Sequence, residues 1–130
     1  LAALLALAFA APALAQSGAI SFSEAGDASA TSKAFADQIA ARYRAGGDYA
    51  AAKADIERNG FRCEAPNPAG MGPTHECVRT VSEAGCQHEW AVELRQSGGV
   101  ALGAASGSFA VMCVGAVLPP KARPAYRPGN

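Results

Sequence analysis

The 130-residue chain lacks the short motifs that mark the common enzyme classes. It has no GxSxG elbow, no HExxH helix, no glycine-rich phosphate loop and no aspartate-rich metal loop. Gly98, Gly99 and Gly103 fall between expected strands and not at a strand-to-helix junction, so they indicate turns. The sequence therefore predicts a protein that is not an enzyme and uses no cofactor. A small periplasmic hydrolase or redox enzyme is the alternative from the enzyme classes.

The chain also lacks a net charge at pH 7, because its eleven acidic residues balance its eleven basic residues. Three of the bases, Lys121, Arg123 and Arg127, lie in the last ten residues, which leaves eight bases against eleven acids elsewhere. A slightly acidic body without a basic face argues against nucleic-acid binding. We expect residues 119–130 to be a proline-rich, basic and disordered tail.

No apolar run reaches the roughly 20 residues that a membrane-spanning helix needs. The run Leu1 to Leu14 has the composition of the apolar core of a secretory signal, and Ala13-Leu14-Ala15 supplies a small-x-small cleavage pattern. We expect residues 1–15 to be a signal peptide truncated at its start. No cysteine follows closely, so no lipid anchor or stable membrane anchor is expected, and the chain is predicted to be exported to the periplasm or secreted.

The chain has only four cysteines, and an even number in a small exported domain predicts two disulfides. If the proline-rich turn at 66–73 joins two antiparallel strands, Cys63 lies nearly opposite Cys77. If the last strand returns beside Cys86, that residue comes near Cys113. We predict these two bridges, and the two other ways of pairing four cysteines remain open at this point.

Helical spacing is confined to the first half of the chain. Residues 16–31 are expected to be a linker, with a short edge strand at 19–23. Residues 32–44 place Phe35, Ile39 and Tyr43 four apart, which predicts an amphipathic helix that starts near Ser32. A second helix is expected over 49–59, with Asp48 as its N-cap and an inward face of Tyr49, Ala52 and Ile56.

After Gly60 the spacing changes to two, which is typical of strands with one buried face. The expected strands are 61–64, 75–81, 86–95 and 109–118, with a turn at 82–85 and a long connection at 96–108. The strand 86–95 sets Trp90, Val92 and Leu94 on one side and Glu89 and Glu93 on the other. The sequence thus predicts one α+β domain over 32–118, with two helices on one face of a three- or four-stranded antiparallel sheet.

A metal site competes with the disulfides for the same cysteines. His75-x-Cys77 and Cys86-x-His88 are mirrored pairs, and i, i+2 spacing on a strand puts both members of a pair on one face. Two thiolates and two imidazoles suit tetrahedral zinc. The alternative prediction is a metal-binding protein that uses these four residues. In the simpler interpretation both histidines are structural, with His88 packed beside Trp90 and bonded to a backbone group.

A helix-covered sheet leaves one face open, and long loops at strand ends often carry binding residues. Glu89 and Glu93 lie on the expected open face, and Met71 lies in the 66–73 loop. These three residues are the predicted interaction surface for a protein partner of unknown identity. The expected function is a non-catalytic protein-interaction module, with an inhibitor or a cell-envelope accessory as two roles of that kind.

Two turns carry a resemblance to a known group. Ala45-Gly46-Gly47-Asp48 precedes the second helix, and Asn59-Gly60-Phe61-Arg62-Cys63 leads from that helix into the first strand. This order resembles the small exported modules of the outer-membrane assembly lipoprotein BamE (SmpA/OmlA) and the beta-lactamase-inhibitor protein. The resemblance implies two helices on an antiparallel sheet and protein binding without catalysis. The chain departs from the lipoprotein members because it has no lipidation cysteine.

Overall fold

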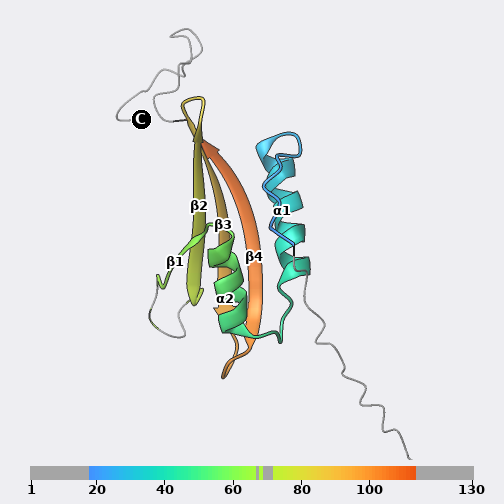
Figure 1. Ribbon diagram of the computed structural model, residues 1–130, viewed down its shortest axis with the longest axis vertical. Coiled ribbons are helices and arrows are strands. Elements are labelled where there is room, and N and C mark those ends of the chain that lie inside the picture. Colours follow the sequence, from blue (N-terminus) through green and yellow to red (C-terminus); the bar gives the residue numbers. More distant parts are fainter. Residues whose placement is uncertain (1–17, 67, 69–71, 114–130) are drawn as a thin grey trace, which may run out of the picture.

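The computed structural model describes residues 18–66, 68 and 72–113. Two helices precede a four-stranded antiparallel sheet with the strand order β1-β2-β3-β4, which confirms the α+β prediction (Figure 1). The expected signal peptide, Met71 and the expected tail lie outside the described residues. No helix in the described part of the chain is long and apolar enough to span a membrane. The elements are α1 (Ala28–Arg42), α2 (Tyr49–Arg58), β1 (Arg62–Glu64), β2 (His75–Glu83), β3 (Cys86–Gln96) and β4 (Leu102–Met112).

The first helix begins four residues earlier than predicted. Asp27 is its N-cap, and the Asp27 carboxylate accepts a hydrogen bond from the Ala30 N–H at 2.8 Å. A carboxylate at this position satisfies an otherwise unpaired amide at the helix start, so the helix begins there and not at Ser32. The linker expected over 16–31 is also wrong, because Ile20 is buried in the core, Phe22 packs against it and residues 28–31 belong to α1. Residues 19–23 are not a strand.

The second helix matches its prediction closely. The Asp48 carboxylate accepts from the Ala51 N–H at 2.8 Å and caps the helix start. The helix ends at Arg58, and Gly60 then adopts a φ of +89°, a left-handed conformation that glycine tolerates and that turns the chain toward β1. As predicted, Tyr49, Ala52 and Ile56 form its buried side.

The strand β3 forms the centre of the sheet and pairs with β2 on one side and β4 on the other. A two-residue turn at Ala84 and Gly85, both with positive φ, joins β2 to β3, where a four-residue turn was expected. The connection expected at 96–108 is wrong, because β4 starts at Leu102 and ends at Met112. The small residues of β4 form the same backbone hydrogen-bond ladder with β3 that larger residues would form. Because their side chains are small, α1 lies close to the sheet.

Both helices cover the same face of the sheet (Figure 1). The core between the layers centres on Trp90, whose ring centroid lies 4.3 Å from that of Phe109 and 5.0 Å from that of Phe35. Phe22 adds an edge-on contact to Trp90 at 5.4 Å. The fully buried aliphatic side chains are Ile39, Ile56, Val92, Leu94 and Leu102.

Both predicted disulfides are present. Cys63 bonds Cys77 between β1 and β2, and Cys86 bonds Cys113 beside the end of β4. Cys63 and Cys77 lie directly opposite each other on neighbouring strands, and Cys113 follows the last residue of β4, Met112, which pairs with Gln87 next to Cys86. Two disulfides in a small domain indicate an oxidising compartment.

Loss of the second bridge has a measurable cost. Replacing both Cys86 and Cys113 with serine is expected to lower the free energy of unfolding by about 2 to 4 kcal/mol, because a closed loop restricts the unfolded chain. Urea unfolding followed by Trp90 fluorescence measures the change. An unchanged midpoint in the double variant would show that the bridge does not stabilise the fold.

Candidate functional site

The structure does not bring together the four residues of the alternative metal site. Cys77 and Cys86 are each in a disulfide, so neither offers a thiolate. The hairpin register pairs His75 with Leu94 and His88 with Val81. Six residues of β2 separate these two levels, which is about 20 Å along a strand. The hypothesis of a metal site at His75, Cys77, Cys86 and His88 is therefore wrong. The two pairs of residues are not placed symmetrically about the turn of the hairpin, so they do not lie opposite each other.

His88 has a structural partner that the sequence did not reveal. Its Nδ1 atom bonds the carboxylate of Glu24, and its ring lies 5.9 Å from that of Phe109. The expected contact with a backbone group is replaced by this side-chain pair. The pair holds the segment before α1 against β3, so His88 stabilises the packing of that segment.

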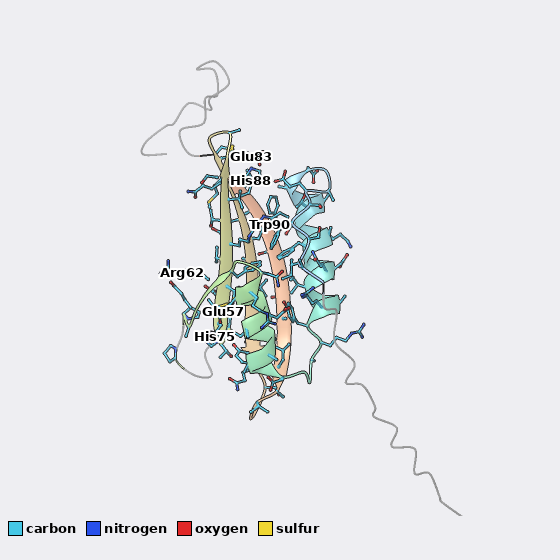
Figure 2. All side chains as sticks on the ribbon, in the orientation of Figure 1. Glu57, Arg62, His75, Glu83, His88 and Trp90 are labelled. Carbon is cyan, nitrogen blue, oxygen red and sulfur yellow. A yellow bond between two sulfur atoms is a disulfide. The ribbon has the colours of Figure 1, made fainter. Side chains whose placement is uncertain are left out.

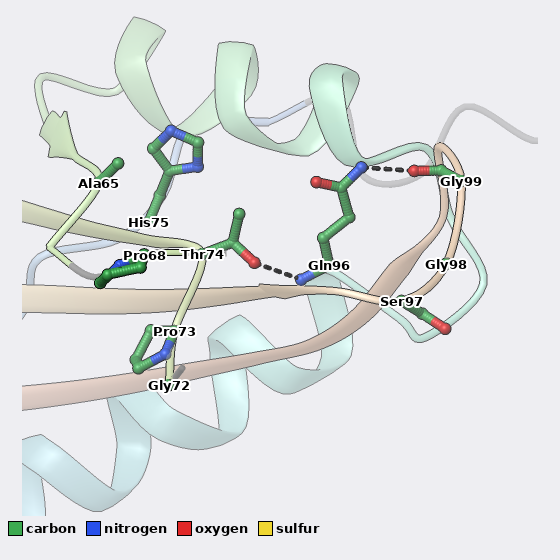
Figure 3. A pocket seen from close by; sticks show the side chains of 10 residues that line it. All are labelled: Ala65, Pro68, Gly72, Pro73, Thr74, His75, Gln96, Ser97, Gly98 and Gly99. Atoms are coloured by element: carbon green, nitrogen blue, oxygen red, sulfur yellow. Dashed lines mark hydrogen bonds between the residues drawn. The ribbon is translucent and has the colours of Figure 1, made fainter. Parts of the chain in front are cut away.

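His75 lies at the opposite end of the sheet from His88 (Figure 2), beside a hollow of about 420 Å³ (Figure 3). Its Nδ1 atom bonds the Tyr49 hydroxyl at 2.6 Å. Nearby, the Thr74 hydroxyl accepts from the Gln96 N–H at 2.9 Å, and the Gln96 side-chain amide donates to the Gly99 carbonyl. These polar groups bond one another across the loops and therefore serve mainly to order the end of the sheet.

The environment of His75 predicts a pH dependence of stability. Burial lowers the pKa of His75, and the nearby Lys53 ammonium lowers it further. A histidine with a depressed pKa in the folded state is neutral there and takes up a proton more readily when unfolded. Its contribution to stability is thus complete above about pH 6.5 and is lost as the pH falls through the folded-state pKa. Thermal unfolding from pH 7.5 to 5 should show this loss, and His75→Gln should remove it. Equal pH slopes for both proteins would contradict the assignment.

The sheet face that points away from the helices is the candidate functional site. We call it the open face; its residues are Arg62 and Glu64 of β1, Glu76, Val78, Thr80 and Ser82 of β2, Gln87, Glu89, Ala91, Glu93 and Arg95 of β3, and Ala104, Ser106, Ser108, Ala110 and Met112 of β4. None of these residues is buried. The predicted surface residues Glu89 and Glu93 both lie on it.

Three carboxylates of the open face lie in a row across adjacent strands. Glu64 is opposite Glu76, and Glu76 is opposite Glu93. We call these three residues the acidic row. The Arg62 Nε atom lies 3.8 Å from the Glu64 Oε1 atom, so Glu64 has an ion-pair partner. No ion pair within the described residues involves Glu76 or Glu93. Like charges directly opposite on neighbouring strands destabilise a sheet, so the row costs the isolated domain stability.

Glu93 was predicted from the sequence but the acidic row was not, because the row depends on the register of the strands. Glu64 faces Glu76 only because the disulfide joins Cys63 to Cys77, the neighbouring pair. Glu76 faces Glu93 only because the turn has two residues; the expected four-residue turn would have set Glu76 opposite Ala91. A shift of two residues keeps each side chain on its face and changes only its neighbour.

No family model, no curated protein and no solved structure matches this chain. The resemblance to BamE-like and beta-lactamase-inhibitor-like modules therefore has no support beyond the turn residues that suggested it.

Proposed function

We propose that this domain is an exported, non-catalytic protein-interaction module that binds a basic protein surface through its open face. The observation that carries the proposal is the asymmetry of the sheet. One face is buried under both helices, whereas no residue of the other face is buried. Antiparallel sheets commonly pack one face on the core and leave the other in solvent, so the open face is available to a protein partner.

The charge of the open face defines the chemistry of the partner. The acidic row and Glu89 place four carboxylates on this face, against two arginines, Arg62 and Arg95. At the centre, Val78 and Ala91 lie side by side and are half-buried, so they offer apolar contact between the charges. A partner with lysine or arginine around a small apolar patch complements this surface. Complementary charges contribute specificity and a fast association rate.

The role can be either that of an inhibitor or that of a cell-envelope accessory, because both need only a stable face that binds a protein. The two disulfides support a location outside the reducing cytosol. The pairing of β2 with β3 over the whole length of β2 and the disulfide beside the end of β4 support a surface that changes little on binding, as in preorganised complexes.

Charge reversal on the open face tests the proposal. The variant with Glu76→Lys and Glu93→Lys is expected to lose the partner protein captured by the unmodified domain, with an affinity loss of at least about tenfold, because opposite charges then become like charges. Asp37→Lys makes the same type of change on the exposed side of α1 and should retain the partner. Quantitative capture from the exported fraction of the source cells, compared among the three proteins, measures the effect. Equal capture by all three would contradict a role for the open face.

A further inference from the structure

The outer edge of β2 is only partly covered. β1 pairs with β2 through Glu76, Cys77 and Val78 alone, whereas β2 continues to Glu83 and pairs with β3 over its whole length. Figure 1 shows no described element beside the upper part of β2 on the side that faces away from β3. We call residues 80–83 the free edge. All four are exposed, and Val81 is one of the few large apolar side chains exposed in the described part of the chain.

The pairing of β1 shows where the backbone groups of the free edge point. The Cα atoms of Cys63 and Cys77 are 3.9 Å apart, and opposed antiparallel residues this close belong to the non-hydrogen-bonded type. The flanking residues Glu76 and Val78 therefore direct their N–H and C=O groups toward β1. Because this direction repeats at every second residue, Thr80 and Ser82 point theirs the same way, past the end of β1.

The neighbouring chain does not fill this space. β1 begins at Arg62, and the residue two positions before it, Gly60, lies on the helix side of the sheet, next to the side chain of Arg79. No hydrogen bond among the described residues engages the outward N–H or C=O of Thr80 or Ser82. Two donors and two acceptors in strand spacing are thus open to another chain.

The opposite edge of the sheet shows how this fold closes an edge. α1 packs along β4, and the Ser32 hydroxyl accepts a hydrogen bond from the outward N–H of Phe109 at 3.0 Å. Near the start of β4, the Gly46 N–H donates to the Leu102 carbonyl at 2.7 Å, and the Leu102 N–H donates to the Gly47 carbonyl at 2.8 Å. Natural sheets commonly cover their edges or place lysine and proline there. The free edge of β2 has neither residue.

We propose that the free edge of β2 is a strand-addition site that takes an extended segment of a partner protein. Only an extended chain presents N–H and C=O groups at the spacing of Thr80 and Ser82. In the added segment of the partner, the side chain beside Val81 would be apolar and lie toward the helix layer. The side chains of the segment beside Thr80 and Ser82 would be polar and lie toward the open face. This site is separate from the acidic row, and a partner needs no basic charge to use it.

Amide exchange in the full chain tests the proposal. The probe is a heptapeptide of alternating threonine and valine with a lysine added at each end. Its matched control is the same peptide with alternate backbone amides methylated, which keeps the charge and removes the donors. In the free protein the Thr80 and Ser82 amides should exchange at least tenfold faster than that of Val81, which faces β3. The probe should slow both at least tenfold, and the methylated peptide should not.

Two variants keep the test independent of folding problems. Thr80→Pro removes one outward donor without removing a β2–β3 hydrogen bond, and it should abolish protection at Ser82. Val81→Lys keeps the backbone groups and removes the apolar contact, so it should weaken protection at least threefold. Equal protection by both peptides would overturn the proposal, as would slow exchange of Thr80 and Ser82 in the free protein. Concentration-dependent dimers with the same protection would also overturn it, because the occupant would then be a second copy.

Discussion

Replacing Asp55 with alanine is expected to lower the free energy of unfolding by about 3 to 5 kcal/mol, because it leaves a buried guanidinium without its counter-charge. Arg42 of α1 is 7% exposed, and its Nε donates to the Asp55 carboxylate at 2.9 Å. The Tyr43 hydroxyl donates to the same carboxylate at 2.6 Å. Asp55 lies on α2, so this cluster joins the two helices directly.

The ionisation of Asp55 gives the same prediction a pH signature. Burial opposes ionisation of the Asp55 carboxyl, but the hydrogen bonds from Arg42 and Tyr43 outweigh it and hold the pKa below its usual value. A carboxyl with a depressed folded-state pKa contributes stability above about pH 4, and the contribution is lost as the pH falls through the folded-state pKa. The variant should therefore be much less stable than the unmodified protein at pH 7, and the difference should narrow toward pH 2.

Urea unfolding at several pH values measures both effects. Asp37→Ala is the matched control, because Asp37 pairs with Lys33 in an exposed i, i+4 bridge that contributes less than about 1 kcal/mol. Adding Arg42→Met to Asp55→Ala should restore part of the loss, since it removes the unpaired buried charge. A loss below about 1 kcal/mol for Asp55→Ala would show that the cluster does not hold the helices together.

Gly107→Val is the second substitution with a large expected effect. A Cβ atom at this position would lie 2.8 Å from Ile39 Cγ1 and 3.1 Å from Phe35 Cδ1, both on the buried side of α1. Neither neighbour can move away without displacing the core, so α1 would have to lift from β4. Overpacking of this kind costs about 3 kcal/mol or more, a large part of the stability of a small domain.

The same position allows a test of the contact itself. Gly107→Ala should cost about 1 to 3 kcal/mol. Combined with Ile39→Ala, which vacates the space, its additional cost should be clearly smaller, because the two residues share one contact. Gly98→Ala is the control, since nothing lies within 4 Å of its Cβ position. Additive losses in the double variant would contradict the close packing of α1 on β4.

The parts of the fold that local pattern determines were predicted well. The alternation of polar and apolar residues predicted the correct face for every side chain of β3. Asp48, recognised as an N-cap, predicted the correct start of α2. The two disulfides were predicted from which strands lie side by side: the proline-rich turn returns the chain from Cys63 to Cys77, and the last strand returns beside Cys86. Local residue chemistry was sufficient for these features.

The errors arose where small residues dominate. The run of alanine, serine and glycine before Phe109 looks like a connection, because it has no bulky side chains to show a period of two. In the folded chain it is β4, and Gly107 is small because α1 packs directly on it. Likewise, Ile20 and Phe22 were assigned to a linker, although Phe22 packs on Trp90 across a long sequence separation. Contacts of this kind depend on the tertiary structure and leave no local pattern.

The candidate site was predicted in part. The face that carries Glu89 and Glu93 was correct, but the acidic row depends on turn length and strand register, which the sequence does not specify to the residue. The free edge of β2 depends on the shortness of β1, which was predicted, and on the length of β2, which was underestimated by two residues.

Site-specific photo-crosslinking tests the central claim most directly. A crosslinking side chain is placed at Ala91, in the middle of the open face, and in a second protein at Ala54, on the exposed side of α2. Both proteins are produced in the source cells, which are then illuminated. An adduct with a partner protein from position 91 and none from position 54 is the predicted result. An adduct from position 54 with none from position 91 would contradict a binding role for the open face.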